Sequence, residues 1–349
     1  MTATAPPAAP GAVATLHPAY FALVMATGIV SIACELVGFR AAAVALFGVN
    51  VVCYPVLWVL TILRVVRYRD RVVADLLDHS RAVGFFTTIA ATCVLGSQAL
   101  LVAGLWGVAA ALWAAGIVLW AGITYAIFGV LMLKDDKPSL ADGINGGWLV
   151  SVVAAQSVSV LGSQLAPGFG PSAPNVLLFC LAMWLGAGML YIWIISLIFY
   201  RYTFFVFSPS DLTPPYWINM GAVAISTLAG ALLTMAVSSS AVIRDLLPFV
   251  KGLTLMFWAT ATWWIPMLVI LGVWRHVYRR FPLRYDPLYW GAVFPFGMYT
   301  VGTFRLSQAL DVPVLMIVPH VFIYVALAAW GLTMAGLVHR LAAGWPRGG

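Results

Sequence analysis

Almost the whole of this chain consists of ten apolar segments, each close to the length needed to cross a bilayer. About 20 helical residues cover the roughly 30 Å of hydrocarbon in a membrane. The expected fold class is therefore all-α and integral to the membrane, with ten transmembrane helices. The predicted spans are 19–38, 43–66, 83–104, 107–133, 147–166, 174–199, 216–237, 251–274, 287–308 and 313–338.

The composition supports one membrane-embedded bundle. Hydrophobic residues make up 63% of the 349 residues and charged residues only 8%, whereas about a quarter of a soluble protein is charged. We expect a ten-helix domain over 17–340, a disordered Pro/Ala-rich tail over 1–16 without the basic start of a signal peptide, and a short tail over 341–349. The four cysteines lie far apart in apolar segments, so we expect no disulfide, metal or cofactor.

Basic residues divide unequally between the two ends of the spans. Fourteen Lys and Arg fall on the side that holds both termini and four on the other. The positive-inside rule then places both termini in the cytoplasm. We expect the chain to lie in the inner membrane of the cell. Topology also explains the net charge of +7, so we do not expect a nucleic-acid partner; the expected partners are small anions and the lipid bilayer.

Odd-numbered and even-numbered spans differ in composition. Even spans carry ten of the fifteen tryptophans, which suits a rim that faces lipid or another subunit. Odd spans carry small and polar residues, which allow close helix approach and can line water. We therefore predict five hairpins with the odd helices around a central pore; the alternative is that small residues mark helix contacts without a lumen. The predicted pore-lining residues are Thr27, Gly28, Ser31, Thr87, Thr88, Thr92, Ser151, Gln156, Asn219, Gly221, Ser226, Gly291 and Thr300.

Phe294 and Pro295 lie near the middle of the ninth span. A proline inside a helix removes one backbone donor and bends or breaks the helix. An aromatic ring at such a bend could close a pore, and the alternative is a kinked packing helix with Phe294 in the core.

Ionisable residues inside spans are candidates for function. Glu35, the only Glu of the chain, could couple protons or could reach the outer interface. Arg305 and His320 could attract anions at the outer side, or could reach the interface in the same way. The charged loop of 67–81 is interpreted as a solvated face, with a basic anion-concentrating mouth as the alternative.

No enzyme motif is present, and inside the predicted spans the one Glu and one His lie on different helices and supply no paired acid and base. Hydroxyl and amide side chains without an inward carboxylate ring favour an anion over a cation.

Four motifs together resemble the tellurite-resistance/C4-dicarboxylate transporter family, which includes plant slow anion channels and yeast malate and sulfite transporters. They are Met25-Ala26-Thr27-Gly28, His79 to Thr87 with Ser80 in place of the usual Pro, Pro214 to Ala222, and Trp290 to Pro295. The resemblance runs from about His17 to His339.

This resemblance implies five hairpins around one pore in each subunit of a homotrimer. It places the family's pore-blocking phenylalanine at Phe294, with Phe296 as the rival. The expected function is transport of C4-dicarboxylates such as malate, or of oxyanions such as sulfite and tellurite. Two alternatives stay open: a proton-coupled dicarboxylate carrier using Glu35 or His320, and a membrane-embedded enzyme or sensor without conductance.

Overall fold

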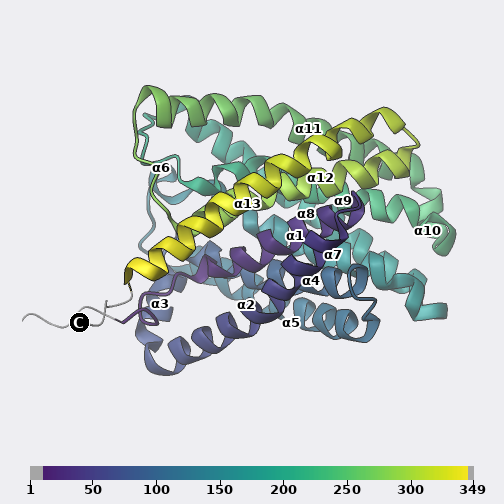
Figure 1. The fold of residues 1–349 in the computed structure, drawn as a ribbon, viewed down its shortest axis with the longest axis horizontal. Coiled ribbons are helices and arrows are strands. Elements are labelled where there is room, and N and C mark those ends of the chain that lie inside the picture. The colour runs from purple at the N-terminus through teal and green to yellow at the C-terminus, as the bar shows by residue number, and fades with distance from the viewer. Residues whose placement is uncertain (1–10, 345–349) are drawn as a thin grey trace, which may run out of the picture.

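A computed structural model describes residues 11–344, and every regular element in that range is helical (Figure 1). The first ten residues of the predicted tail and residues 345–349 lie outside the described range. Five helices are buried in the centre: α1 (Ala22–Leu36), α4 (Phe86–Leu101), α7 (Val150–Leu165), α9 (Ile218–Met235) and α12 (Trp290–Leu310). Five longer helices surround them: α2 (Arg40–Arg67), α5 (Trp106–Leu133), α8 (Ala173–Phe204), α11 (Leu247–Val273) and α13 (Ile317–Gly344). Three short helices lie in connections: α3 (Arg69–Leu77), α6 (Leu140–Gly143) and α10 (Ala241–Asp245).

The five central helices form a closed ring. In order around the ring, α1 packs against α4, α4 against α7, α7 against α9, α9 against α12, and α12 against α1 again. Each central helix also packs against the outer helix that follows it in the chain, so the fold consists of five hairpins.

Burial separates the two sets of helices. In the spans that contain α1, α4 and α9, 83–89% of the most apolar stretch is buried. In the spans that contain α2, α5, α11 and α13, the buried share of this stretch is only 11–22%. A helix that is apolar all round and buried all round belongs in the interior of a bundle, whereas the outer helices present their exposed faces to lipid.

Eight segments of the described chain are long and apolar enough to cross a membrane. One of them, Gly146–Phe204, has 59 residues and contains both α7 and α8, which are joined at Gly170 (φ 53°) in the turn η4 (Ala166–Ser172). A positive φ of this size suits glycine because it has no Cβ. Helix α12 is not among the eight. The chain is thus an all-helical membrane protein, and the count of ten spans stays a prediction.

The tryptophans of the outer helices point inward more than the expected rim would require. Trp184 donates to the Ser226 carbonyl at 2.8 Å, Trp258 to the Thr303 hydroxyl at 3.0 Å and Trp330 to the Thr27 hydroxyl at 2.9 Å. These three tryptophans therefore face the ring helices, whereas Trp193 and Trp263 are exposed, as expected for a rim. Indole N–H groups seek partners when buried, and the polar atoms of the ring helices supply them.

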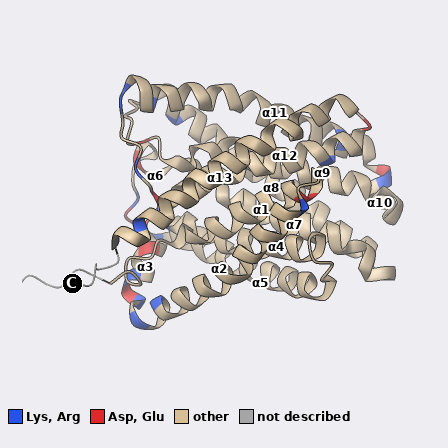
Figure 2. Ribbon diagram, viewed as in Figure 1, with Lys and Arg blue, Asp and Glu red and all other residues tan. Residues whose placement is uncertain are grey.

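Charged residues gather at the two ends of the helices and are sparse between them (Figure 2). The end at which α13 finishes carries the loops with most of the basic residues. We call it the inner end and the opposite end the outer end.

Candidate functional site

A cavity of about 150 Å³ lies at the inner end of the ring, and we call it the inner cavity. All five ring helices border it close to their first residues, through Ala22, Thr87, Val150, Ile218 and Gly291. Each of these helices is preceded by a tight 3-10 turn: η1 (Pro18–Phe21), η2 (Ala82–Phe85), η3 (Gly146–Leu149), η5 (Pro214–Trp217) and η8 (Pro287–Tyr289). Five positive helix ends therefore meet at one cavity, and a helix N-terminus favours an anion.

Most of the first backbone N–H groups of these turns are either already hydrogen-bonded or missing because the residue is proline. Proline occupies a first-turn position at the start of η1, η5 and η8. Because proline has no backbone N–H, no donor is left unsatisfied at these positions. The side chains of His17, Asn145 and Asp286 accept from the amides of Ala19, Gly147 and Leu288. The inner cavity thus offers a favourable field with few free amide donors, which suits a site that must also release its anion.

His17 caps the first turn and is uncharged at neutral pH. Burial, with a smaller contribution from the Arg81 guanidinium, lowers the pKa of its imidazole to about 4. A neutral ring is consistent with Nδ1 accepting the Ala19 amide at 3.1 Å. His17 therefore borders the inner cavity as a neutral group.

A second cavity on the ring, the outer cavity, lies toward the outer end and has a volume of only about 10 Å³. This is about the space of one water molecule. It too is bordered by all five ring helices, and its polar lining includes Ser97, Ser157, Gln164 and Arg305. The Gln164 Oε1 atom is buried there without a hydrogen-bond partner among the described residues.

The lining residues of the two cavities fall on one face of each ring helix. On α12, Gly291 borders the inner cavity, and Met298, Val301 and Arg305 border the outer cavity. Gly291 and Met298 are seven residues apart, which is about two helical turns. The same interval separates Thr87 from Val94 on α4, Val150 from Ser157 on α7, and Ile218 from Ile225 on α9. The two cavities therefore lie on a common axis.

Phe294 occupies the lining face of α12 between the two cavities. Pro295 faces α9, since a Cβ at Gly221 would lie 2.7 Å from its Cγ, and Gly297 faces α1, since its Cβ would lie 2.9 Å from Ile29. At about 100° per residue, Phe294 lies within about 20° of the midline between these two directions. The ring is fully buried.

At the corresponding positions, three other ring helices carry smaller side chains: Ala90 and Ala91 on α4, Val153 and Ala154 on α7, Gly221 and Ala222 on α9. The fourth, α1, carries Met25, which is fully buried and borders the inner cavity. Helical position therefore sets the Phe294 ring opposite small side chains on three helices and Met25 on α1.

Phe296 lies on the opposite face of α12. Its ring packs against Trp217 with the centroids 4.7 Å apart, and it borders a separate cavity outside the ring of helices. Helix α12 continues through Pro295 as one helix from Trp290 to Leu310, so the chain does not break there.

Few of the predicted pore-lining residues border either of the two cavities. Thr87 and Gly291 border the inner cavity, and Gly221 packs against Pro295. A larger group contacts the outer helices: Ser31 donates to the Ala43 carbonyl, Thr92 bonds to Tyr54, Gln156 donates to the Trp184 carbonyl, Thr27 accepts from Trp330, Gly28 lies against Asn50, and the backbone of Asn219 accepts from Tyr191. The hydroxyls of Thr88, Ser151, Ser226 and Thr300 bond to carbonyls one turn earlier in their own helices.

The three coupling candidates are not brought together. Glu35 forms an ion pair with Arg40 at 2.6 Å near the outer end. His320 is exposed on α13, with Nδ1 2.6 Å from the Met316 carbonyl. Arg305 borders the outer cavity, and its Nη1 donates to Gln308.

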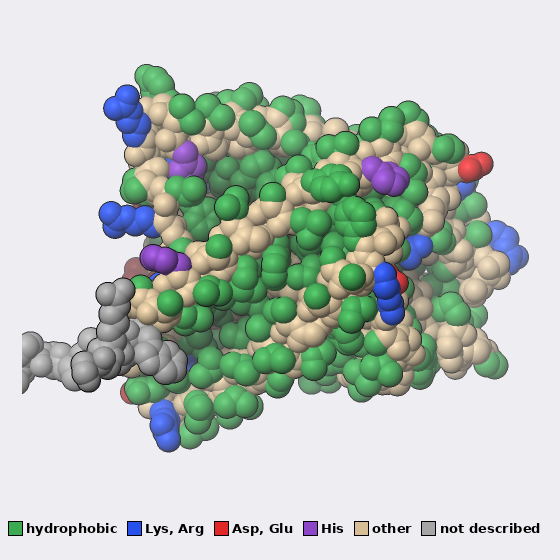
Figure 3. Space-filling view, in the orientation of Figure 1, with side chains coloured by type: hydrophobic (Ala, Val, Ile, Leu, Met, Phe, Trp, Pro, Cys, Tyr) green, Lys and Arg blue, Asp and Glu red, His purple; other side chains and the backbone are tan. Residues whose placement is uncertain are grey.

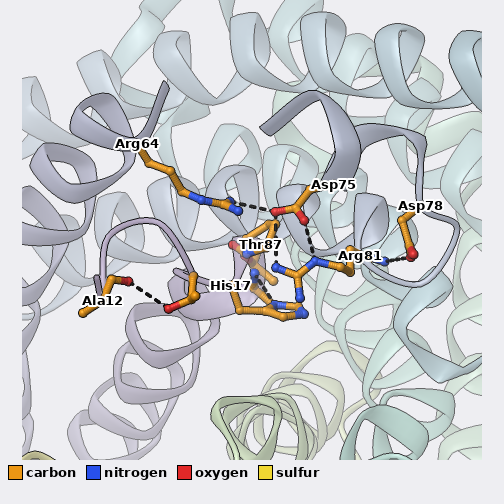
Figure 4. A network of polar contacts seen from close by, with 10 residues as sticks. Ala12, His17, Arg64, Asp75, Asp78, Arg81 and Thr87 are labelled. Carbon is orange, nitrogen blue, oxygen red and sulfur yellow. Dashed lines mark hydrogen bonds and ion pairs between the residues drawn. The ribbon is translucent and has the colours of Figure 1, made fainter. Parts of the chain in front are cut away.

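Most charged residues of the loop at the inner end are exposed, as expected for a solvated face, but Asp75 is buried. Asp75 of α3 bonds to both Arg64 of α2 and Arg81 before α4 (Figure 4). The Arg64–Asp75 distance is 2.7 Å, and both side chains are more than nine-tenths buried. This pair fastens α3 beside the entrance of the inner cavity, where Ser80 belongs to the lining. Sequence reasoning missed it because alternating charges do not reveal which one turns inward.

Comparison with known proteins agrees with this architecture. The sequence model of the SLAC1 family, described as voltage-dependent anion channel, matches residues 15–338. An uncharacterised membrane protein of Mycobacterium tuberculosis is 43% identical over 161 residues, which cover 46% of this chain and 81% of that protein. An uncharacterised transporter of Methanocaldococcus jannaschii is 26% identical, with 94% of each chain covered. A sulfite efflux pump of Trichophyton rubrum is 24% identical over 94% of this chain and 92% of its own length.

Proposed function

Because this chain belongs to the SLAC1 family of voltage-dependent anion channels, we propose that it conducts small anions along the axis of its five-helix ring, and that Phe294 closes this path. The observation that carries the proposal is the alignment of the two cavities on one face of every ring helix. We infer from the spacing along α12 that Phe294 lies on this face between them. An aromatic ring at a narrow apolar constriction can hold a pore closed because water leaves it.

The proposed path attracts anions at both ends. Five helix N-termini face the inner cavity, and Arg305 borders the outer cavity. Between them the lining is small and apolar, without a carboxylate. An anion is thus drawn in by the field and held weakly, which permits rapid exit.

The membrane topology follows from the same arrangement. We propose ten crossings, with α7 and α8 counted separately and α12 as the ninth. The excess of basic residues at the inner end supports a cytoplasmic position for both termini in the inner membrane. Exposed aromatic side chains such as Trp193 and Trp263 on the outer helices leave a surface on which copies of this chain could associate as a homotrimer.

The substrate class is proposed from the size of the inner cavity and from a relative. About 150 Å³ holds a small oxyanion or a C4-dicarboxylate such as malate. The Trichophyton rubrum relative is named a sulfite efflux pump. We therefore propose sulfite-like oxyanions, tellurite among them, as the first substrates to test.

Flux in proteoliposomes tests the function directly. Chloride, malate, sulfite and tellurite are compared with and without a membrane potential, and with and without a pH gradient. We expect saturable anion flux that follows the voltage and is unchanged by the pH gradient. Absence of flux for every anion in both the parent protein and Phe294→Ala would refute the proposal in favour of a non-conducting protein.

A proton-coupled carrier is the alternative, and two placements weigh against it. Glu35 is neutralised by Arg40, and His320 lies on the exposed face of α13, away from the ring axis. Were flux to require a pH gradient and to lose this requirement in Glu35→Gln, the carrier would replace the channel.

Arg305→Gln should lower the inward flux of anions from the outer side several-fold at low ionic strength. The guanidinium raises the local anion concentration at the outer cavity, and salt screens that effect over about 10 Å at 0.1 M. The measurement is initial flux at 10 mM and 300 mM salt. Arg244→Gln is the control, because Arg244 lies at the same end on α10, outside the cavity lining. Equal losses in the two variants at both salt concentrations would contradict the assignment.

A further inference from the structure

A larger cavity of about 450 Å³ lies outside the ring of helices, and we call it the lateral cavity. It is bordered by the start of α9, the turn that ends α11, the outward face of α12 and the middle of α13. Figure 3 shows the surface between α11 and α13 hollowed toward the inner end. The function proposed above does not use this cavity.

Arg275 lines the lateral cavity with no carboxylate paired to its charge among the described residues. The residue is 6% exposed, its Nε and Nη1 atoms have no hydrogen-bond partner among the described residues, and no ion pair there includes it. Burying a charged group without a partner is costly, and a guanidinium presents a planar fork of donors that matches phosphate or carboxylate oxygens. An unpaired, buried Arg275 in a roomy cavity therefore indicates an anionic ligand.

The local backbone explains why Arg275 points there. Helix α11 ends in a π-helical turn, η7 (Trp274–Tyr278), in which the Arg279 amide bonds to the Trp274 carbonyl at 2.8 Å. The Arg275 guanidinium lies over the Phe281 ring at 4.4 Å. Turns of this kind occur at the C-terminal ends of helices.

The rest of the lining selects among anions. Trp217, Phe296, Ala292, Ala329 and Leu332 form an apolar wall, and Leu332 is largely exposed on α13, so the cavity opens sideways between the outer helices. The exposed Arg284 adds a second cation at the rim. A free phosphate would satisfy the guanidinium and leave the apolar wall uncovered. A phosphate that carries an alkyl chain satisfies both.

We propose that the lateral cavity binds an anionic phospholipid from the membrane leaflet at the inner end. Its phosphate bonds to Arg275, and the first part of one acyl chain lies against Trp217 and Phe296. The volume holds the phosphate and part of a chain, while the remainder of the lipid stays in the bilayer beside α13.

One consequence concerns the axis and rests on the proposed function. Ala292 and Phe296 in the cavity wall flank Phe294 on the same turns of α12. A bound lipid braces these turns from behind and thereby favours one position of the Phe294 ring. The binding itself is independent of whether the protein conducts.

The test measures binding alone. The purified full chain in a neutral detergent is titrated with short-chain phosphatidylglycerol or phosphatidylcholine, and adducts are counted by native mass spectrometry. We expect phosphatidylglycerol to bind at least about tenfold more tightly than phosphatidylcholine, and Arg275→Gln to remove that preference. Phosphatidylglycerol should also raise the melting temperature of the parent protein and not of Arg275→Gln, since a ligand of the folded state stabilises it.

Two further variants separate the explanations. Arg279→Gln removes an exposed charge one turn away, outside the cavity lining, and should keep the preference. Ala329→Leu fills the apolar wall with Arg275 intact and should lose binding. Equal losses in Arg275→Gln and Arg279→Gln, or displacement of the lipid by an equal concentration of inorganic phosphate, would overturn the proposal. These readouts hold even if no anion flux is found.

Discussion

Phe294→Ala should raise anion flux about tenfold or more, because truncation of the ring removes the closure of a narrow apolar constriction. Phe294 is fully buried on the lining face of α12 between the two cavities. The measurement is the current or the initial anion flux in proteoliposomes at a fixed voltage, normalised to the amount of folded protein.

Phe296→Ala is the matched control for this variant. It removes the same ring two residues further on, from the opposite face of α12, where Phe296 packs against Trp217. We expect its basal flux, measured in vesicles without anionic lipid, to change far less than that of Phe294→Ala. Truncation of a buried phenylalanine costs about 3–5 kcal/mol of stability, so thermal melting is recorded for both variants. A gain of flux in both variants would mean that loosening α12, and not opening the axis, is the cause; a loss of stability without any gain in Phe294→Ala would make the residue a packing residue.

Asp75→Asn should destabilise the inner end by about 3–5 kcal/mol, the cost of breaking a buried ion pair by removal of one partner. The substitution leaves Arg64, which is buried, without its only ion-pair partner among the described residues. Arg81 is one-third exposed and should contribute less, since solvent screens it. The expected result is a lower melting temperature in detergent and faster proteolysis within residues 67–82, where α3 is fastened.

Asp70→Asn provides the comparison for Asp75→Asn. It makes the same change of charge at an exposed position in the first turn of α3, where no ion pair is formed. Its stability should stay within about 0.5 kcal/mol of the parent protein, as for most surface substitutions. Similar melting curves for the two variants would show that the buried pair contributes little net stability.

Much of the architecture could be predicted from the sequence because it depends on composition. Spans are visible from apolar length, and the odd helices are distinguished by small residues that permit close packing. Gly221 illustrates the link, since a side chain there would collide with Pro295 on the neighbouring helix.

The direction in which each polar residue points could not be predicted in the same way. Every residue of α1 from Ala22 to Cys34 is buried, so the helix has no exposed face against which to measure the others. Thr27 and Ser31 satisfied the chemistry of a pore lining, yet both bond to outer helices. A hydroxyl inside a bundle can hydrogen-bond equally well to a neighbouring tryptophan or to water. The periodicity of the sequence does not distinguish these two cases. Arg275 directly follows the predicted span of 251–274, and nothing in its local sequence indicates the π-helical turn.

The ring of α1, α4, α7, α9 and α12 closes within a single polypeptide. On the proposed function, any assembly of several copies would contain as many separate routes as chains. An inactive copy in a mixed assembly would then abolish only its own transport, and total activity would fall in proportion to the fraction of inactive copies. Substitutions could then change the transport rate of each protomer without matching changes in the neighbouring protomers.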